Sequence, residues 1–267
     1  VLHYTQTPAQ FAHWLKGVWQ TYPFDTLVCF GDCRPLHQAA CRWSNAKGLR
    51  FLAFEEGYLR PHFITLEIGG VNAYSSLPRE SDFYRQLPEM PPRVIQSLQP
   101  STCQRYRHAT WYYLIGWFHQ KQYPHYRHHK SFSPWYEMRC WIRAWRRKHW
   151  YAFRERHVLS RLQNQLDNRY YLAILQVYND SQIRQHSPYN DVREYINDVI
   201  YSFATKAPVT KFLVFKHHPM DRGHRLYTPL IKWLSKKYGV ENRVLYVHDL
   251  PMPEMLKHAK AVVTINS

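Results

Sequence analysis

Acidic side chains are scarce in this sequence, and several of them stand where an apolar run stops. The chain has 19 Asp and Glu residues against 36 Lys and Arg, and four of the acids follow short apolar runs: Asp32, Glu55, Glu56 and Asp180. A carboxylate that cations keep ionised can act as a nucleophile, whereas one beside apolar walls has a raised pKa and can act as a general acid. Two such groups flanking a glycosidic carbon would support double displacement with retention of configuration. The alternative for each acid is a helix N-cap or an ion pair with one of the many arginines.

The stretch FKHHPMDRG places two histidines and a proline directly after another apolar run. Pro219 ends strand pairing because its ring removes a backbone donor and fixes φ. The side chains before it are then presented at the carboxyl end of a strand, where ligands bind in layered α/β folds. Lys216, His217 and His218 could hold an anion there, and the alternative is a turn with two satisfied surface histidines.

The chain closes on VVTINS, in which Asn266 and Ser267 follow a predicted strand. The hydroxyl and the free N–H groups at the start of a helix form a good phosphate site, and an ordinary N-cap is the alternative. Because the sequence stops where that helix should begin, we expect the second α/β half to be incomplete.

Strand and helix signals alternate in two parts of the chain. The first part reads as a βαβ unit, with strands at 27–30 and 50–54 around a helix from about 35 to 48, which predicts a parallel sheet. The second part repeats this rhythm, and its predicted strands lie at 170–177, 212–215, 244–247 and 261–265.

Between these parts, residues from about 80 to 165 read as basic, aromatic and helical. Such a segment suits a surface on anionic lipid, with aromatic rings at the headgroups and arginines on the phosphates. The alternative is a helical pair that buries its aromatic residues in a core. The aromatic residues concerned include Trp111, Tyr112, Tyr113, Trp117, Phe118, Trp135, Trp141, Trp145 and Trp150.

These elements predict an α/β protein with two Rossmann-like halves in a GT-B-like frame and a basic helical insert. We expect a first domain over 1–165, which includes the insert, and a second, truncated domain over 166–267. Fold alone does not give function, so the site residues must carry that conclusion.

The charge balance limits the partners that the protein can have. A formal net charge of +17 favours anions: nucleic acid, an anionic membrane surface or a phosphorylated or carboxylated substrate. Two functions other than sugar transfer stay open at this point, namely nucleic-acid binding and a metal-dependent phosphoesterase built on Gly31, Asp32 and the histidines.

Several classes of site and segment lack their sequence signatures. The five cysteines have no framework spacing and read as reduced thiols. No GxGxxG or Walker A sequence is present, and no His or Cys spacing is typical of a metal site, so we expect no cofactor and no metal. No apolar run approaches 18 to 20 residues, and the first residues lack the form of a secretory signal.

Five motifs together resemble the KpsS/LipB type of capsule polysaccharide biosynthesis protein: FGDCRPLHQAA, FEEGYLRPHFITLE, LQVYNDSQI, FKHHPMDRG and VVTINS. The resemblance runs from about residue 25 to the last residue. It implies a retaining β-Kdo glycosyltransferase of Gram-negative bacteria, which uses CMP-Kdo and starts the poly-Kdo linker on a lysophosphatidylglycerol-type lipid. It also implies a cytoplasmic protein, peripheral on the inner face of the inner membrane, that works with other capsule biosynthesis and export proteins and not with nucleic acid.

The resemblance also implies roles for individual residues. His218-Pro219 would bind the ribose and phosphate of CMP, assisted by Lys216 or His217, and Asn266-Ser267 would contact the same phosphate. Of the remaining residues, Asp180 would be the nucleophile, Glu55 (or Glu56) the acid/base, and Arg60 the clamp on the Kdo carboxylate, with Asp32 and Arg34 as further binding candidates. A guanidinium suits a carboxylate because it forms two parallel hydrogen bonds with it.

Overall fold

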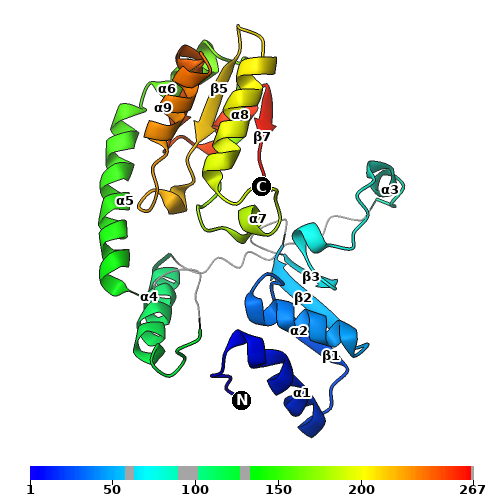
Figure 1. Cartoon of the computed structure of the whole chain (residues 1–267). Coiled ribbons are helices and arrows are strands. Elements are labelled where there is room, and N and C mark those ends of the chain that lie inside the picture. Colours follow the sequence, from blue (N-terminus) through cyan, green and yellow to red (C-terminus); the bar gives the residue numbers. More distant parts are fainter. Residues whose placement is uncertain (58–62, 90–101, 127–132, 266–267) are drawn as a thin grey trace. The chain divides into compact units, whose positions relative to one another are not determined.

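The computed structural model describes residues 1–57, 63–89, 102–126 and 133–265. The chain divides into two compact units, Val1–Phe132 and Ser133–Ser267. Each unit has its own sheet and its own helices (Figure 1). This division falls earlier than the boundary at 165/166 expected from the sequence, because the helices between residues 133 and 165 pack within the second unit.

The first unit contains a sheet with the strand order β1-β2-β3. Strands β1 (Thr26–Phe30) and β2 (Arg50–Glu56) are parallel, which confirms the βαβ unit predicted from the sequence. Strand β3 (Ile64–Ile68) pairs with β2 in the antiparallel sense and was not predicted. The first sheet is therefore mixed, and only its β1–β2 pair has the expected parallel form.

Helices α1 (Phe11–Thr21) and α2 (Pro35–Ala46) supply the helical side of the first unit's core. Proline stands in the first turn of α2, where its missing N–H costs nothing. Alternate residues of β2 point to opposite faces, so Phe51 and Ala53 are buried while Leu52 and Phe54 are only half-buried. The unit also contains η1 (Pro8–Gln10), η2 (Asn72–Tyr74), α3 (Ser81–Arg85) and α4 (Thr102–His119).

The second unit contains four parallel strands in the order β6-β5-β4-β7. These strands are β4 (Tyr170–Ile174), β5 (Phe212–Lys216), β6 (Val244–Val247) and β7 (Ala261–Val263). Numbered along the chain this is the order 3-2-1-4, which is the start of the Rossmann doubly wound arrangement. In such sheets ligands bind outside the carboxyl ends of the strands, at the point where the winding reverses, here between β4 and β7.

Helices cover both faces of this second sheet. On one face, α8 (Val192–Lys206) and α9 (Thr228–Lys237) form a core with β4 and β5. On the other face, α6 (Val158–Asn164) and α10 (Met252–His258) form a second core. Short turns complete the unit: α7 (Ser181–Arg184), η3 (Pro219–Asp221) and η4 (Glu241–Arg243).

Helix α8 shows how the sequence produces these layers. Its N-cap is Asp191, whose side chain accepts a hydrogen bond from the Arg193 N–H. Its buried residues recur at helical spacing and form one stripe against the sheet. They are Val192, Tyr195, Ile196, Val199, Ile200 and Phe203.

Helix α5 (Pro134–Arg154) is the longest described helix of the second unit and starts at the N-cap Ser133. One stripe of its side chains, which we name the inner stripe, is buried or half-buried: Glu137, Cys140, Ala144, Arg147 and Tyr151. This stripe packs on the loop that follows β5, where the guanidinium of Arg147 donates to the carbonyl of Arg222 at 2.7 Å.

Within the described residues, no helix is both long and apolar enough to cross a membrane. The expected α/β class with parallel strands is confirmed by both units.

Candidate functional site

The carboxyl end of β5 carries the His-His-Pro motif, and several buried, hydrogen-bonded polar side chains surround it. His217 is fully buried, and its Nδ1 lies 2.6 Å from the hydroxyl of Tyr246 on the neighbouring strand. Burial, followed by His248 and then by the nearby cationic side chains, lowers the pKa of His217 to about 3. His217 is therefore neutral and faces the interior of the unit.

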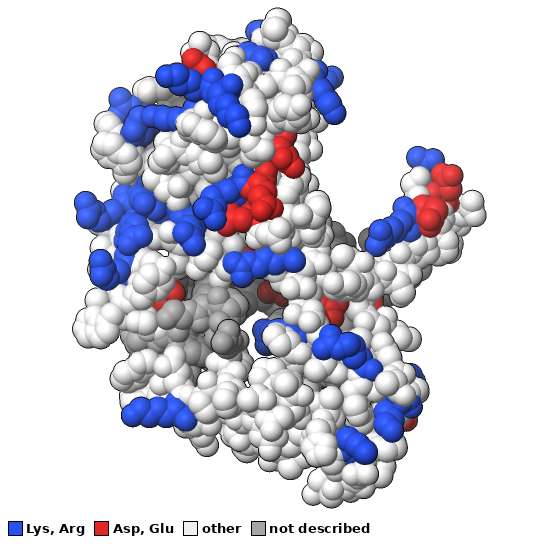
Figure 2. Space-filling model, in the orientation of Figure 1, with Lys and Arg blue, Asp and Glu red and all other residues white. Residues whose placement is uncertain are grey.

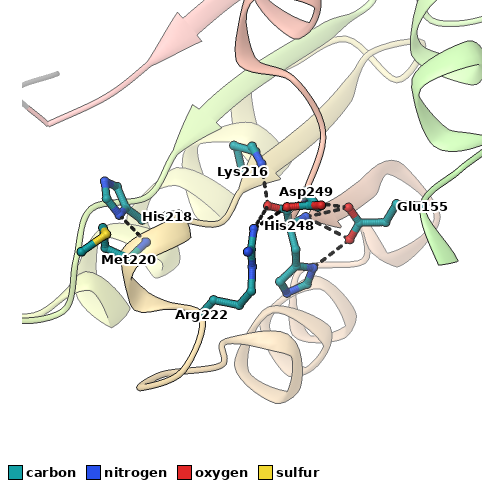
Figure 3. Close-up of polar contacts among 7 residues, drawn as sticks. All are labelled: Glu155, Lys216, His218, Met220, Arg222, His248 and Asp249. Atoms are coloured by element: carbon teal, nitrogen blue, oxygen red, sulfur yellow. Dashed lines mark hydrogen bonds and ion pairs between the residues drawn. The ribbon is translucent and has the colours of Figure 1, made fainter. Parts of the chain in front are cut away.

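Lys216 also points into this interior. Its ammonium donates to the main-chain carbonyl of His248 at 2.6 Å (Figure 3). Burial lowers the pKa of Lys216 to about 8, although the carboxylates of Glu155 and Asp249 oppose the shift. A buried charge costs free energy unless it is hydrogen-bonded and paired, and both conditions are partly met here.

His218 is the histidine of the motif that is presented at the edge. It is the N-cap of η3, and its Nδ1 accepts a hydrogen bond from the N–H of Met220 at 3.2 Å (Figure 3). The neutral ring must then carry its proton on Nε2, so that this atom is a hydrogen-bond donor. Burial lowers the pKa of His218, and the charge of Asp180 opposes that fall.

The structure thus brings His218 and Asp180 together. Asp180 lies in the turn after β4, where its N–H bonds to the carbonyl of Val177 and its carbonyl accepts from the N–H of Ile183. Because β4 and β5 are adjacent parallel strands, the segments that follow them meet at one edge of the sheet. That edge is the ligand-binding edge of a doubly wound fold.

A buried carboxylate supports this edge from the side of α5. Glu155 accepts hydrogen bonds from the main-chain N–H groups of His248 and Asp249, at 2.9 and 3.0 Å. Burial alone would raise the pKa of Glu155, but its hydrogen bonds to His248 and Asp249 outweigh burial, and the pKa falls. The ring of His248 also stacks on that of Tyr151, with centroids 3.5 Å apart.

An ion pair ties the loop after β5 to the loop after β6. The guanidinium of Arg222 lies 2.5 Å from the carboxylate of Asp249, and both side chains are largely buried. The neighbouring Asp221 is fully buried and accepts a hydrogen bond from the hydroxyl of Tyr227. The loop that carries His218 is therefore fixed from several directions.

These supporting residues were not among the site residues predicted from the sequence. Glu155 had one signal, since it is the only acidic residue between Glu137 and Asp167 in a strongly basic segment. His248 and Asp249 had another, because they follow a predicted strand as the His-His-Pro motif does. Only the three-dimensional contacts show that the two signals belong to one network.

In the first unit, Asp32 lies at the carboxyl end of β1 and is buried. Its Oδ2 accepts from the N–H of Val71 at 2.7 Å, and its Oδ1 accepts from the thiol of Cys33 at 2.9 Å. Burial raises the pKa of the Cys33 thiol, and the carboxylates of Asp32 and Glu55 raise it further. The carboxylates of Asp32 and Glu55 therefore both lie near Cys33, at the ends of β1 and β2.

The structure fixes the strand phase of the two neighbouring glutamates in β2. Glu55 shares a face with the buried Phe51 and Ala53, and its carboxylate accepts a hydrogen bond from the side chain of Asn72. Glu56 points to the opposite face and is exposed.

The remaining candidates are less well defined by the structure. Arg34 is the N-cap of α2 and is exposed, with its guanidinium 5.7 Å from the ring centre of Phe30. Arg60, Asn266 and Ser267 lie outside the described residues.

The arrangement at the second sheet can bind an anion and present a carboxylate beside it. His218 offers an N–H donor at the edge, and Asp180 offers a carboxylate close to it. A phosphate that leaves in a substitution could thus be held by a donor while a nucleophile stands nearby.

Comparisons with known proteins agree with one another. A family model described as "Capsule polysaccharide biosynthesis protein" matches residues 25–267. The chain is 68% identical over 266 residues to the capsule polysaccharide export protein KpsS of Escherichia coli, which covers 100% of this chain and 68% of KpsS. It is 36% identical over 262 residues to the capsule polysaccharide modification protein LipB of two Neisseria meningitidis strains, of serogroups B and A.

The LipB matches cover 96% of this chain and 62% of each LipB. The chain therefore spans about two thirds of the length of these relatives. No solved structure matches it significantly.

Proposed function

Because the chain belongs to the capsule polysaccharide biosynthesis protein family, we propose that it is a retaining glycosyltransferase that moves Kdo from CMP-Kdo to a lysophosphatidylglycerol-type lipid. The matches confirm the resemblance drawn from the motifs. The observation that carries the proposal is that His218 and Asp180 follow two adjacent parallel strands at the carboxyl edge of a Rossmann-ordered sheet, near enough for the charge of Asp180 to act on the imidazole. The N–H of His218 is suited to bind a phosphate, and the carboxylate of Asp180 is suited to attack the carbon that the phosphate leaves.

The second unit is the proposed donor side. His218 would donate from Nε2 to the phosphate of CMP, with Pro219 setting the turn. The segment after β7, which ends in Asn266 and Ser267, would contact the same phosphate. Lys216 and His217 would assist from the interior of the unit: the positive charge of Lys216 would attract the phosphate, and His217 would support the turn that carries His218.

In the proposed reaction, the carboxylate of Asp180 attacks the anomeric carbon of Kdo. A carbon–oxygen bond forms to the enzyme while the bond to the CMP phosphate breaks, and CMP leaves with the bonding electron pair. The acceptor hydroxyl then attacks the same carbon, loses its proton to the base, and displaces Asp180. Two inversions give net retention.

The first unit is the proposed acceptor side of a GT-B-like enzyme. Glu55 is the proposed acid/base, because it lies at a strand end on the buried face, while the exposed Glu56 is the second choice. Arg60 is the proposed clamp on the Kdo carboxylate, and Asp32 and Arg34 are further candidates for substrate contact. The reaction as proposed uses neither a metal nor a cofactor.

The lipid acceptor implies a place of action. We place the protein on the cytoplasmic face of the inner membrane as a peripheral protein, in contact with other capsule biosynthesis and export proteins. The net charge of +17 supports a surface that attracts anionic lipid.

The test uses the protein, CMP-Kdo and no acceptor, and measures intact mass. Wild type should gain the mass of one Kdo residue, whereas Asp180→Ala should gain none. The matched control is Asp198→Ala, which removes an exposed carboxylate of α8 and should keep the adduct.

Each outcome has a distinct meaning. An adduct on wild type and on Asp198→Ala alone supports the covalent mechanism. Turnover on the lipid acceptor without any adduct would remove double displacement but keep the transferase. Neither adduct nor turnover with any acceptor would overturn the proposed function.

A further inference from the structure

Helix α5 presents an apolar stripe that no described part of its own unit covers. We name it the outer stripe: Trp135, Met138, Ile142, Trp145 and Phe153. Exposure is 73% for Trp135, 65% for Trp145 and 62% for Phe153, values that buried core positions never reach. Aliphatic and aromatic side chains exposed together along one face of a helix mark an interaction surface.

The outer stripe runs opposite the inner stripe along the same helix. The inner stripe advances by steps of three and four residues, and so does the outer one from Trp135 to Trp145, after which Phe153 follows eight residues later with His149 between them. The outer stripe starts two residues before the inner one at Glu137. Two residues correspond to about 200° around an α-helix, so the stripes face in nearly opposite directions. The inner stripe is occupied by the loop after β5, because a Cβ on Gly223 would lie 2.2 Å from the carbonyl oxygen of Cys140.

The sides of the outer stripe are cationic. Arg139, Arg146, Lys148 and Arg154 are all exposed on α5. The only acidic residue of the helix is Glu137, which belongs to the inner stripe and lies 3.6 Å from the imidazole of His224. In Figure 2, Lys and Arg side chains gather along the side of the molecule where Figure 1 shows α5.

We propose that the outer stripe of α5 docks the protein onto an anionic lipid bilayer, with α5 lying in the plane of the headgroups. Trp135 and Trp145 sit at the level where indole rings prefer to lie, and Met138, Ile142 and Phe153 enter the acyl boundary. The basic side chains extend along the helix surface to the lipid phosphates. The inference rests on the proposed function only in its choice of a lipid acceptor, and it specifies which surface meets that lipid.

The composition of the outer stripe favours a bilayer over nucleic acid. Bases stack on aromatic rings, but Met138 and Ile142 offer neither a stacking plane nor a hydrogen bond. A bilayer instead accepts any apolar side chain along the whole row while the cations pair with its phosphates.

The experiment is flotation of the protein with vesicles in the absence of donor and acceptor. One set of vesicles contains equal parts of phosphatidylglycerol and phosphatidylcholine, and the other contains phosphatidylcholine alone. Wild type should float with the anionic vesicles, and Trp145→Glu should reduce that partition about tenfold or more. Arg139→Gln combined with Arg146→Gln should reduce the partition to a smaller extent. The partition of this double variant should also depend less on salt concentration than that of wild type.

Matched controls come from α9 of the same unit. Trp233→Glu changes an exposed tryptophan on another surface, and Lys232→Gln with Lys236→Gln removes two exposed charges there. Both should float as wild type does. Equal melting temperatures for Trp145→Glu and Trp233→Glu would show that the loss of partition is not unfolding.

Equal flotation of Trp145→Glu and Trp233→Glu would overturn the inference, as would absence of wild-type flotation. A change of oligomeric state in Trp145→Glu without a change in flotation would assign the stripe to another copy of the chain. RNA binding that depends on Trp145, without lipid binding, would assign it to nucleic acid. None of these readouts uses CMP-Kdo, so failure of the docking surface is distinct from failure of the transferase.

Discussion

The carboxylate of Glu155 and the ring of His248 form a buried contact of 2.9 Å between the end of α5 and the segment after β6. The two residues are 93 positions apart in the sequence. Glu155 is ionised and His248 is neutral, since burial lowers the pKa of His248 more than Glu155 raises it. The imidazole therefore donates from Nδ1 to the carboxylate, in addition to the main-chain donors of His248 and Asp249. This contact holds in place the carbonyl that Lys216 binds.

Removing the charge of Glu155 should destabilise the second unit. Glu155→Gln replaces an acceptor of several hydrogen bonds by a group that also donates, which should cost about 3 kcal/mol in urea unfolding. Because the pKa of Glu155 is lowered in the folded state, this contribution is present above about pH 4.5 and is lost as pH falls through the native value. The control Glu254→Gln, which removes the half-buried partner of the exposed Lys257, should change little because such surface ion pairs contribute little. Equal effects of the two substitutions would contradict the assignment.

The neutral state of His217 should appear in the pH dependence of stability. Its pKa is lowered from 6.5 to about 3 in the folded protein, so between these values the unfolded chain binds more protons. Stability must then fall as pH is lowered through this window, by up to about 1.4 kcal/mol per pH unit from this group. His217→Gln should flatten that slope in unfolding curves measured from about pH 6 to pH 4. An unchanged slope would show that His217 does not carry the effect.

The two roles of His218 can be separated by comparing two substitutions. Asparagine can cap η3 as His218 does, whereas alanine cannot, so His218→Ala alone should lose about 1 kcal/mol of stability. Both substitutions remove the Nε2 donor, and both should weaken CMP binding about tenfold in calorimetry. Retained CMP affinity in His218→Asn would limit His218 to the turn.

The contact between α5 and the loop after β5 leaves no room at Gly223. A methyl group there would overlap the carbonyl of Cys140, so Gly223→Ala should destabilise the second unit by about 2 kcal/mol. Gly17 in α1 has open space around it, and Gly17→Ala should instead stabilise its helix slightly. Thermal unfolding measured for both variants would test the contrast, and a neutral Gly223→Ala would mean that α5 can shift outward.

Apolar patterning predicts the second unit well. The runs at 170–177, 244–247 and 261–265 contain β4, β6 and β7, and the run at 212–215 matches β5 except for its last residue, Lys216. The central strands β4 and β5 are largely buried, and a buried parallel strand is apolar on both faces. Strand β3 (Ile64–Ile68) was missed because it is a short edge strand whose apolar side chains, Ile64, Leu66 and Ile68, are exposed, so that no buried apolar run marks it. Its antiparallel pairing depends on contacts with β2 that no local pattern encodes.

The candidate site was predictable only at the ends of strands. Asp180 and His218 were found from the sequence because each follows an apolar run, and adjacent parallel strands place such ends together. Lys216 and His217 follow the same run, but the strand pairing continues through them, and both side chains are buried in the interior. The main-chain N–H of His217 still donates to the carbonyl of Val247, as that of a strand residue would. Glu155 was missed because its partners are distant in sequence and because a lone acid among arginines suggests only a surface ion pair.

The packing of α5 also determines how far the loop after β5 lies from whatever surface contacts the outer stripe. A helix with its side chains is about 10 to 12 Å across, so its outer stripe and the loop after β5 are separated by one such thickness. A bilayer that met the outer stripe would thus lie about one helix thickness from the loop that carries His218. Under the proposed function, a lipid acceptor would approach that level along the membrane while its acyl chain stayed in the lipid.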